Sequence, residues 1–144
     1  MTSTLRSGFH KYSFPQGSNA NILLDLTHRD QVLASEIHIV DSTHVQGYRR
    51  SSAWSKNQIV YFALEFSKPF ISIKGEIDSL LMDGMNSGKI FNAKKILCAF
   101  HFETNGNEAI YVKVGISAVS ETNALLNLTT EIPGWDFEKV KSDA

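Results

Sequence analysis

The stretch from Gln58 to Phe66 constrains the fold more than any other part of the sequence. It is almost entirely apolar, and its β-branched and aromatic residues favour the extended backbone of a strand. Large apolar side chains recur at alternate positions on one face: Val60, Phe62, Leu64 and Phe66. The other face carries one charge, at Glu65, so we expect both faces to be covered. Pro69 cannot donate to a sheet ladder and ends the strand, which we interpret as the central strand of a β-sandwich.

Alternating apolar residues mark further strands on both sides of this segment. The expected strands are 8–14, 20–26, 36–40, 44–50, 70–77, 95–103 and 109–119. The expected connections include a turn at 15–19, a polar connector at 27–33, a turn at 41–43 and an exposed tip at 83–88. The pattern predicts a mostly β chain that folds as an antiparallel two-sheet β-sandwich.

The sequence Asn105-Gly106-Asn107 is the strongest turn signal of the chain. Asn-Gly readily takes the positive φ angles of a type I′ turn, which joins paired antiparallel strands. The segments before and after it, 95–103 and 109–119, both show strand alternation. We therefore expect these two segments to form a β-hairpin.

One segment has helical rather than strand character. Ser120 is a suitable N-cap, Leu125 and Leu128 recur at helical spacing, and Pro133 ends the pattern. These signals predict one short helix, of about two to three turns, near residues 121–130. A further pattern begins at Trp135.

Composition and charge exclude several classes of function. The chain has 144 residues, the size of one domain, and its net charge of −1 argues against a nucleic-acid partner. No stretch reaches the length of a membrane span, and we expect no signal peptide because the N-terminus lacks an apolar segment. The one cysteine, Cys98, lies in an apolar run, so we expect a buried, inert thiol rather than a nucleophile.

Potential acid–base groups are scattered along the chain. Carboxylates fall at separate strand ends: Asp25, Asp30, Glu36, Asp41 and Glu65. No spacing among them singles out a pair held across a cleft, so we assign no catalytic residue. The polar cluster from Asp25 to Asp30 could bind a cation or a sugar hydroxyl, although a loop held by its own hydrogen bonds is the simpler interpretation.

The histidines show no metal-binding motif. His38 and His44 could approach each other across a hairpin turn. Ordinary strand histidines, exposed or hydrogen-bonded, are the simpler interpretation, so we assign no metal ligand.

Arg49, Arg50 and Trp54 form the most informative group of side chains. An indole face stacks on sugar rings, and a guanidinium donates directed hydrogen bonds to hydroxyls. These three residues are therefore the candidate carbohydrate-binding site. In the competing interpretation Trp54 is a core anchor with an arginine stacked on it. The sequence leaves both interpretations open.

Three stretches, taken in order, carry a family resemblance. The first joins Gly-Phe-His-Lys-Tyr-Ser-Phe-Pro at 8–15 to Asn-Ile-Leu-Leu-Asp-Leu at 21–26. The second runs from Gly-Tyr-Arg-Arg-Ser at 47–51 to Phe70, and the third joins 113–117 to Glu-Ile-Pro-Gly-Trp-Asp-Phe at 131–137. Together they resemble the N-terminal domain of glycoside hydrolase family 92, the exo-acting α-mannosidases of bacteria such as Bacteroides. The resemblance covers nearly the whole chain, residues 4–141.

The resemblance implies a fold, a reaction and a partner. The fold is a large β-sandwich of the galactose-mutarotase-like supersandwich type, packed on an (α/α)6 catalytic domain. The reaction is calcium-dependent hydrolysis of α-mannosides, α-1,2 linkages among them, with inversion by an acid and a base. In the family those carboxylates and the calcium ligands lie in the helical domain. The resemblance therefore assigns no catalytic residue, metal ligand or cofactor to this chain.

The chain departs from the family pattern at both ends. It stops just after Trp135-Asp136-Phe137, where the helical domain is expected. It also lacks a glycine-rich and aromatic stretch that the family carries before the segment at 8–15. We therefore expect residues 1–144 to be a single, partial sandwich domain that is inert on its own. Family members are usually exported to the periplasm or cell surface, although this chain shows no export signal.

Two alternatives stand beside an inert part of a mannosidase. One is a free-standing interaction or dimerisation domain. The other is a carbohydrate-binding module that holds mannosides with Trp54, Arg49 and Arg50. Missing strands would leave sheet edges exposed, so we also expect self-association through paired edges or exchanged strands.

Overall fold

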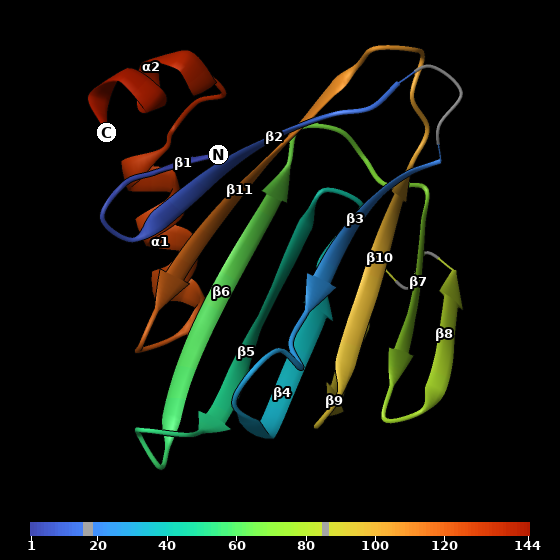
Figure 1. Ribbon diagram of the computed structural model, residues 1–144, viewed down its shortest axis with the longest axis vertical. Helices are drawn as coiled ribbons and strands as arrows, with labels where there is room; N and C mark the ends of the chain where they lie inside the picture. The colour runs from blue at the N-terminus through green and yellow to red at the C-terminus, as the bar shows by residue number, and fades with distance from the viewer. Residues whose placement is uncertain (16–18, 85–86) are drawn as a thin grey trace.

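Two antiparallel sheets enclose one core in the computed structural model, which describes residues 1–15, 19–84 and 87–144 (Figure 1). The large sheet has the order β1 (Thr2–Ser3), β2 (Ser7–Ser13), β11 (Ala109–Ser117), β6 (Gln58–Phe66), β5 (His44–Ser52), β4 (Gln31–Ile39) and β9 (Ile90–Ala93). The small sheet has the order β3 (Ala20–Asp25), β10 (Ile96–Phe102), β7 (Ser72–Ile77) and β8 (Leu80–Gly84). This arrangement confirms the predicted antiparallel two-sheet β-sandwich.

Strand β6 lies at the centre of the large sheet, between β11 and β5. Phe62, Leu64 and Phe66 belong to the core between the sheets. On the opposite face Ala63 is 1% exposed, because the helix α1 (Glu121–Glu131) packs over it and over Gly115 of β11. The prediction of a central strand with both faces covered is therefore confirmed.

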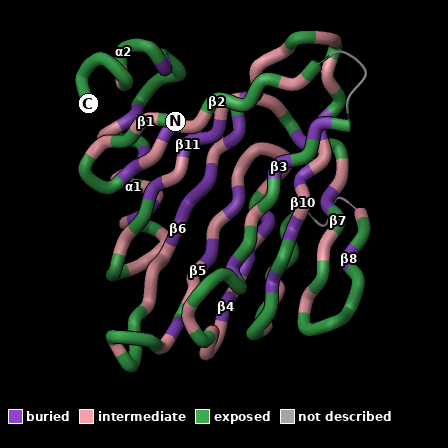
Figure 2. The backbone as a smooth tube through the Cα atoms, viewed as in Figure 1, coloured by how far each residue is buried: buried purple, intermediate pink, exposed green. Residues whose placement is uncertain are grey.

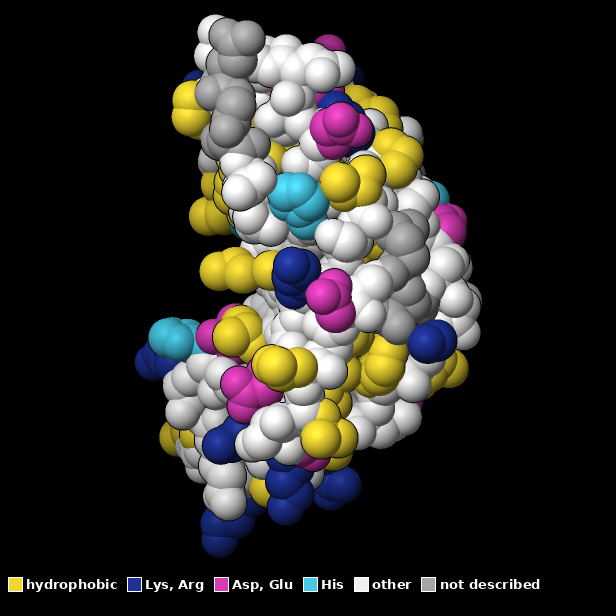
Figure 3. Space-filling view, turned by 90° about the vertical axis from the view of Figure 1, so that its right-hand side faces the viewer, with side chains coloured by type: hydrophobic (Ala, Val, Ile, Leu, Met, Phe, Trp, Pro, Cys, Tyr) yellow, Lys and Arg dark blue, Asp and Glu magenta, His cyan; other side chains and the backbone are white. Residues whose placement is uncertain are grey.

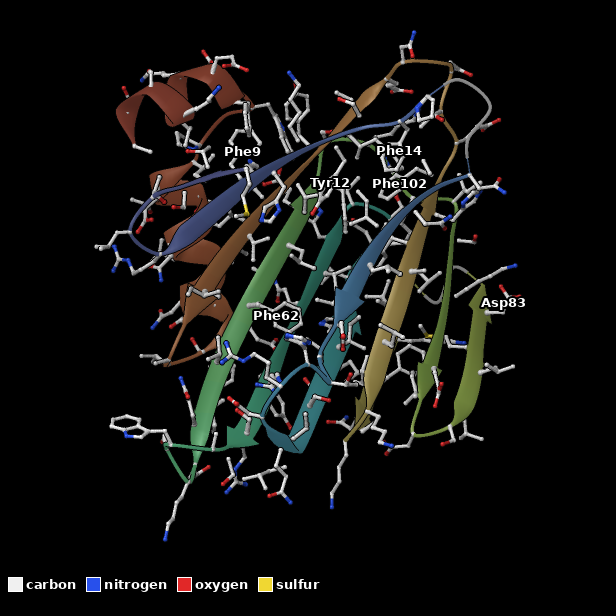
Figure 4. All side chains as sticks on the ribbon, in the orientation of Figure 1. Phe9, Tyr12, Phe14, Phe62, Asp83 and Phe102 are labelled. Atoms are coloured by element: carbon white, nitrogen blue, oxygen red, sulfur yellow. The ribbon has the colours of Figure 1, made fainter. Side chains whose placement is uncertain are left out.

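Phenylalanine rings from both sheets meet in the core. The ring centroid of Phe66 in β6 lies 5.1 Å from that of Phe100 and 5.4 Å from that of Phe102, both in β10. Phe70, in the connection from β6 to β7, is 5.1 Å from Phe100. Phe14 packs against this cluster beside Phe102 (Figure 4). Buried residues run along the facing strands of both sheets (Figure 2).

Helix α1 forms where the sequence predicts it. The Ser120 side chain caps it by accepting a hydrogen bond from the Asn123 backbone N–H at 3.1 Å. The helix lies on the outer face of the large sheet, where a Cβ at Gly115 would come 2.2 Å from the Ala124 carbonyl oxygen. Only glycine permits this close approach at that position. The predicted short helix near 121–130 is confirmed.

A second helix, α2 (Phe137–Asp143), follows where the sequence showed only the start of a pattern. Phe137 packs with Phe9 of β2 and with Ile132, and these buried residues form a small second core. The ring centroids of Phe9 and Phe137 are 5.3 Å apart. Both helices therefore cover the β2–β11 side of the large sheet (Figure 1).

The predicted hairpin between 95–103 and 109–119 is wrong. Strand β10 pairs with β3 and β7 in the small sheet, whereas β11 pairs with β2 and β6 in the large sheet. Gly106 and Asn107 do have positive φ angles, of 60° and 47°, as the turn chemistry predicts. The connection nevertheless crosses from one sheet to the other. Alternation gives each strand a core face and does not say which sheet the strand joins.

Two connections also differ from the prediction, and a third is largely untested. The connector at 27–33 is shorter, because β4 begins at Gln31 and has a bulge between Val32 and Ala34. The expected tip at 83–88 begins inside β8, which ends at Gly84, and residues 85–86 lie outside the described residues. The predicted turn at 15–19 also falls largely on residues that the structure does not describe, 16–18.

Lys113 is a buried cation on the outer face of β11, 3% exposed. Its Nζ lies 2.8 Å from Oε2 of Glu65, which is opposite it on β6. The same ammonium sits 4.1 Å from the ring centroid of Trp135 and donates to the Ile132 carbonyl at 3.4 Å. These contacts tie the segment between the two helices to the centre of the large sheet.

We expect Lys113→Met to lower the free energy of unfolding by about 3 kcal/mol, because it leaves Glu65 partly buried without its cation. The double variant Lys113→Met/Glu65→Leu removes both charges together and should recover most of that loss. Urea denaturation measures both variants. A double variant as unstable as Lys113→Met alone would show that the ion pair is not the source of the effect.

The turn at 41–43 confirms another prediction and is built on the Asp41 carboxylate. Oδ1 accepts hydrogen bonds from the Thr43 N–H at 2.6 Å, the Thr43 hydroxyl at 2.8 Å and the His44 N–H at 2.8 Å. Burial alone would raise the pKa of Asp41, but these hydrogen bonds and the adjacent His44 ring outweigh it and lower the pKa to about 2.

The Asp41 carboxylate should make the fold less stable in acid. A depressed pKa gives stability that is fully present above the unfolded pKa of 3.8 and is lost as the pH falls through about 2. Asp41→Asn should therefore flatten the decline of unfolding free energy between about pH 4 and pH 2. Urea denaturation across this range tests it, with the exposed Asp83→Asn as the control. Equal slopes in wild type and Asp41→Asn would contradict this assignment.

Candidate functional site

The candidate carbohydrate residues lie around the β5–β6 turn, at the lower end of the molecule in Figure 1. Arg49 and Arg50 are consecutive in β5, so their side chains leave opposite faces of the sheet. Trp54 lies in the turn itself, between the last residue of β5 and the first of β6. Lys and Arg side chains gather at this lower end of the surface (Figure 3).

The Arg49 guanidinium binds the connection between β3 and β4. Its Nε donates to the Leu26 carbonyl at 2.9 Å, and its Nη2 donates to the His28 carbonyl at 2.9 Å and the Asp30 carbonyl at 3.1 Å. Three backbone acceptors thus hold one guanidinium, which pins the loop to β5. Arg49 acts as a structural residue at this end of the sandwich.

The polar cluster from Asp25 to Asp30 is the loop that Arg49 holds. Asp25 Oδ1 accepts from the Thr27 hydroxyl at 2.6 Å and from the Thr27 N–H at 2.7 Å. These two hydrogen bonds lower the pKa of Asp25 below its ordinary value. The simpler interpretation, a loop held by local hydrogen bonds, is confirmed, and the Asp25 carboxylate already has partners within the chain.

Arg50 and Trp54 point away from the core. Arg50 Nε donates to Oδ1 of Asn57 at 2.7 Å, across the turn. Trp54 is 98% exposed, so the interpretation of this residue as a core anchor is wrong. The physical reason is its place: Trp54 lies in the turn beyond the ends of β5 and β6, outside both core clusters of the described residues. The structure therefore places Arg50 and Trp54 at the β5–β6 turn, whereas the Arg49 side chain binds the connection between β3 and β4.

His38 and His44 do not form a pair. His44 Nδ1 lies 2.9 Å from Oδ2 of Asp41, and His38 is opposite Gln46 in the β4–β5 ladder. Among residues 1–15, 19–84 and 87–144, no group of three or more His, Cys, Asp and Glu side chains is placed to hold a metal ion. The interpretation as ordinary strand histidines agrees with these contacts.

Cys98 is fully buried in β10, with 0% exposure. Burial raises the pKa of its thiol to about 12, because the thiolate would be desolvated. The prediction of a buried, inert cysteine is confirmed.

Glu131 is an anchor that the sequence did not single out. Its Oε2 accepts from the Thr4 hydroxyl at 2.5 Å and the Arg6 N–H at 2.9 Å, and its Oε1 pairs with Arg6 Nε at 2.8 Å. Burial alone would raise the pKa of Glu131, but these partners outweigh it and lower the pKa. Thr4 and Arg6 are 127 and 125 residues away in sequence, so no local pattern could have shown the contact.

No helix in the described part of the chain is long and apolar enough to cross a membrane.

Comparison with known proteins identifies the family. The glycosyl hydrolase family 92 N-terminal domain matches residues 1–117. A family 92 α-mannosidase of Bacteroides thetaiotaomicron, solved with mannoimidazole, superposes on 99% of this chain with a TM-score of 0.88 and 27% identity. A family 92 inverting mannosidase of the same species superposes on 96% of the chain with a TM-score of 0.80, and its 20% identity supports the fold alone.

A shorter match links the chain to a curated sequence. An uncharacterized secreted glycosidase of Arthroderma benhamiae is 45% identical over 47 residues, which is 31% of this chain and 6% of that protein. The chain spans only a fifth of the two Bacteroides structures, 20% and 18% of their lengths. The family match nevertheless covers most of the chain, and the superposition covers nearly all of it. The chain therefore belongs to the glycosyl hydrolase family 92 N-terminal domain family.

Proposed function

We propose that this chain is the non-catalytic sandwich part of a family 92 α-mannosidase that hydrolyses α-1,2-linked mannosides. One observation carries the proposal: the superposition on a family 92 α-mannosidase over 99% of the chain at 27% identity. The sandwich would pack against an (α/α)6 catalytic domain and support the sugar pocket between them. Inversion would then use an acid and a base from that second domain.

Two carboxylates of the described residues, Glu65 and Glu131, support the non-catalytic role. Glu65 pairs with the buried Lys113, and Glu131 binds Thr4 and Arg6. A glycosidase needs two carboxyl groups facing each other across room for a sugar and a water. Glu65 and Glu131 instead each bind groups of their own fold.

Calcium, which the family resemblance implies, does not fit the described residues. The loop carboxylates of Asp25 and Asp41 accept hydrogen bonds from Thr27 and Thr43, at 2.6 to 2.8 Å. A calcium site needs six to eight oxygen ligands around one point. The family's calcium would therefore bind to residues of the catalytic domain, and no step of the reaction is assigned to calcium in this chain.

Export to the periplasm or cell surface is part of the proposal. The Arthroderma relative, which is described as a secreted glycosidase, supports it. An α-mannosidase acting on external glycans would need this location.

A second function, direct sugar contact, is favoured by Trp54. Its ring is 98% exposed at a turn that Arg50 and Asn57 brace by a 2.7 Å hydrogen bond. An exposed indole is a stacking surface for a sugar ring, and the Arg50 guanidinium in the adjoining strand has further N–H donors for hydroxyls. Arg49 would contribute only by holding the neighbouring loop.

We expect residues 1–144 alone not to hydrolyse 4-nitrophenyl α-mannoside or α-1,2-mannobiose, with or without added calcium. Release of nitrophenol and of mannose measures the two reactions. A full-length family 92 α-mannosidase serves as the positive control. Turnover by the 144-residue chain, abolished by a single Asp or Glu substitution, would refute the non-catalytic role.

Sugar contact at Trp54 has a separate optical test. Mannose or mannobiose should shift the tryptophan fluorescence of the chain, because a stacked sugar changes the solvation of the exposed ring. Trp54→Ala should remove the response, whereas Trp135→Phe, the matched control, should keep it. No change at about 100 mM sugar, a concentration that would saturate even a site of millimolar affinity, would end this candidate.

A further inference from the structure

Strand β3 forms a free edge of the small sheet. Within the described residues it pairs only with β10. The Leu26 N–H donates to the Ile96 carbonyl at 3.0 Å, which fixes the hydrogen-bonding phase of this antiparallel pair. Because bonded and non-bonded pairs alternate, the backbone N–H and C=O groups of Asn21, Leu23 and Asp25 point away from β10. The edge thus presents three regularly spaced donor–acceptor pairs.

The side chain at the centre of this edge is apolar, with Asn21 on one side of it and the charged Asp25 on the other. Leu23, at its centre, is 68% exposed. Of the usual devices that keep edge strands from pairing, β3 has no lysine, proline or bulge, and its one charged side chain is Asp25 at its last position. Behind it a cavity of about 290 Å³ opens between the sheets, lined by Ile22 and Leu24 of β3 and by His10 and Tyr12 of β2 among others. The edge therefore offers both unpaired backbone and uncovered apolar surface.

We propose that β3 is the dimerisation edge of this chain, where β3 of a second copy adds in antiparallel orientation about a two-fold axis. With Leu23 opposite Leu23 of the second copy, each outward N–H lies opposite an outward C=O of the other strand. This register gives about six hydrogen bonds across the interface. Among two-fold registers centred on an outward residue, only this one pairs all three outward positions of both copies. It joins the two small sheets into one continuous sheet.

Side-chain complementarity supports the same register. Two-fold pairing about Leu23 places each Asn21 opposite Asp25 of the other copy, so that an amide faces a carboxylate. Asn21 Oδ1 lies 3.3 Å from His101 Nδ1 on β10, and Nδ2 donates to the Asn19 carbonyl at 2.9 Å, so one of the two amide N–H groups is left for the carboxylate. Ile22 faces Leu24 of the second copy on the inner side, over the mouth of the cavity.

The opposite edge of the small sheet, β8, is a poorer candidate. Leu81 is 90% exposed there, but the strand is only five residues long. It ends at Gly84, which has a φ angle of 116° that strand continuation does not allow. A two-fold pairing about Met82 would place the Asp83 carboxylate opposite Leu81 of the second copy. Complementarity therefore favours β3.

Sedimentation velocity of the 144-residue chain across about 1 to 500 µM tests the proposal, because a dimer forms by mass action. The expected result is a concentration-dependent shift from 16.1 kDa towards twice that mass. Leu23→Lys should weaken dimerisation about tenfold or more, since two ammonium groups would face each other. Leu81→Lys, the matched control on β8, should leave it unchanged. A monomer at every concentration, or dimers lost in Leu81→Lys alone, would overturn the proposal.

A charge exchange tests the register without changing side-chain size. Asn21→Asp places two carboxylates opposite each other and should weaken the dimer; the new carboxylate still accepts from His101 but no longer donates to the Asn19 carbonyl, a loss that the double variant shares. The double variant Asn21→Asp/Asp25→Asn restores carboxylate against amide and should restore dimerisation. The amide that Asp25→Asn introduces keeps an oxygen to accept from Thr27. Circular dichroism confirms that each variant is folded, and a double variant weaker than Asn21→Asp would overturn the register.

Discussion

The phenylalanine cluster between the sheets is the contact on which the rest of the structure depends. Phe66 comes from the large sheet, Phe100 and Phe102 come from the small sheet, and Phe70 lies in the connection between them. Each ring buries apolar surface that is worth about 1.5–3 kcal/mol, and the tilted contacts add to this. Because the cluster fixes which faces of the sheets meet, it also fixes which faces remain outside. That division leaves the helices and Lys113 on the outer face of the large sheet and the candidate sugar turn at the end of the sandwich.

Much of this division could be read from the sequence, because period-two alternation reports which side of a strand is apolar. The central strand and the other long strands were found in this way, whereas the capped helix was found from its N-cap and its helical spacing. Pairing partners were not, as the connection between β10 and β11 shows: both strands alternate, yet they join different sheets. The short strands β8 and β9 were missed because they are only five and four residues long, and Leu80-Leu81-Met82 does not alternate. Their place is set by pairing with β7 and β4 rather than by their own pattern.

The candidate site could also be predicted only in part from the sequence. Sequence placed Arg49, Arg50 and Trp54 together because they lie within one hairpin, and the alternation of β5 already implies opposite faces for the two arginines. The partners of Arg49 could not be predicted, since Leu26, His28 and Asp30 are 19 to 23 residues away on another connection. The exposure of Trp54 depends on how far the turn projects beyond the sandwich, which no local pattern encodes. Long-range contacts therefore decide which residues of the motif remain available to a ligand.

The two sides of the sandwich differ in how completely their polar groups are used. On the helix-covered side, Lys113 meets Glu65 and Arg6 meets Glu131, so that side is closed by charge pairs as well as by packing. On the small sheet, the outward backbone groups of β3 carry full hydrogen-bonding capacity beside an exposed Leu23. The unpaired backbone groups of an edge strand form new hydrogen bonds when another strand adds to them. Charges that are already paired would first have to give up a partner, so they gain less free energy from a new contact. A second copy of this chain would therefore gain most by meeting the small sheet at its edge.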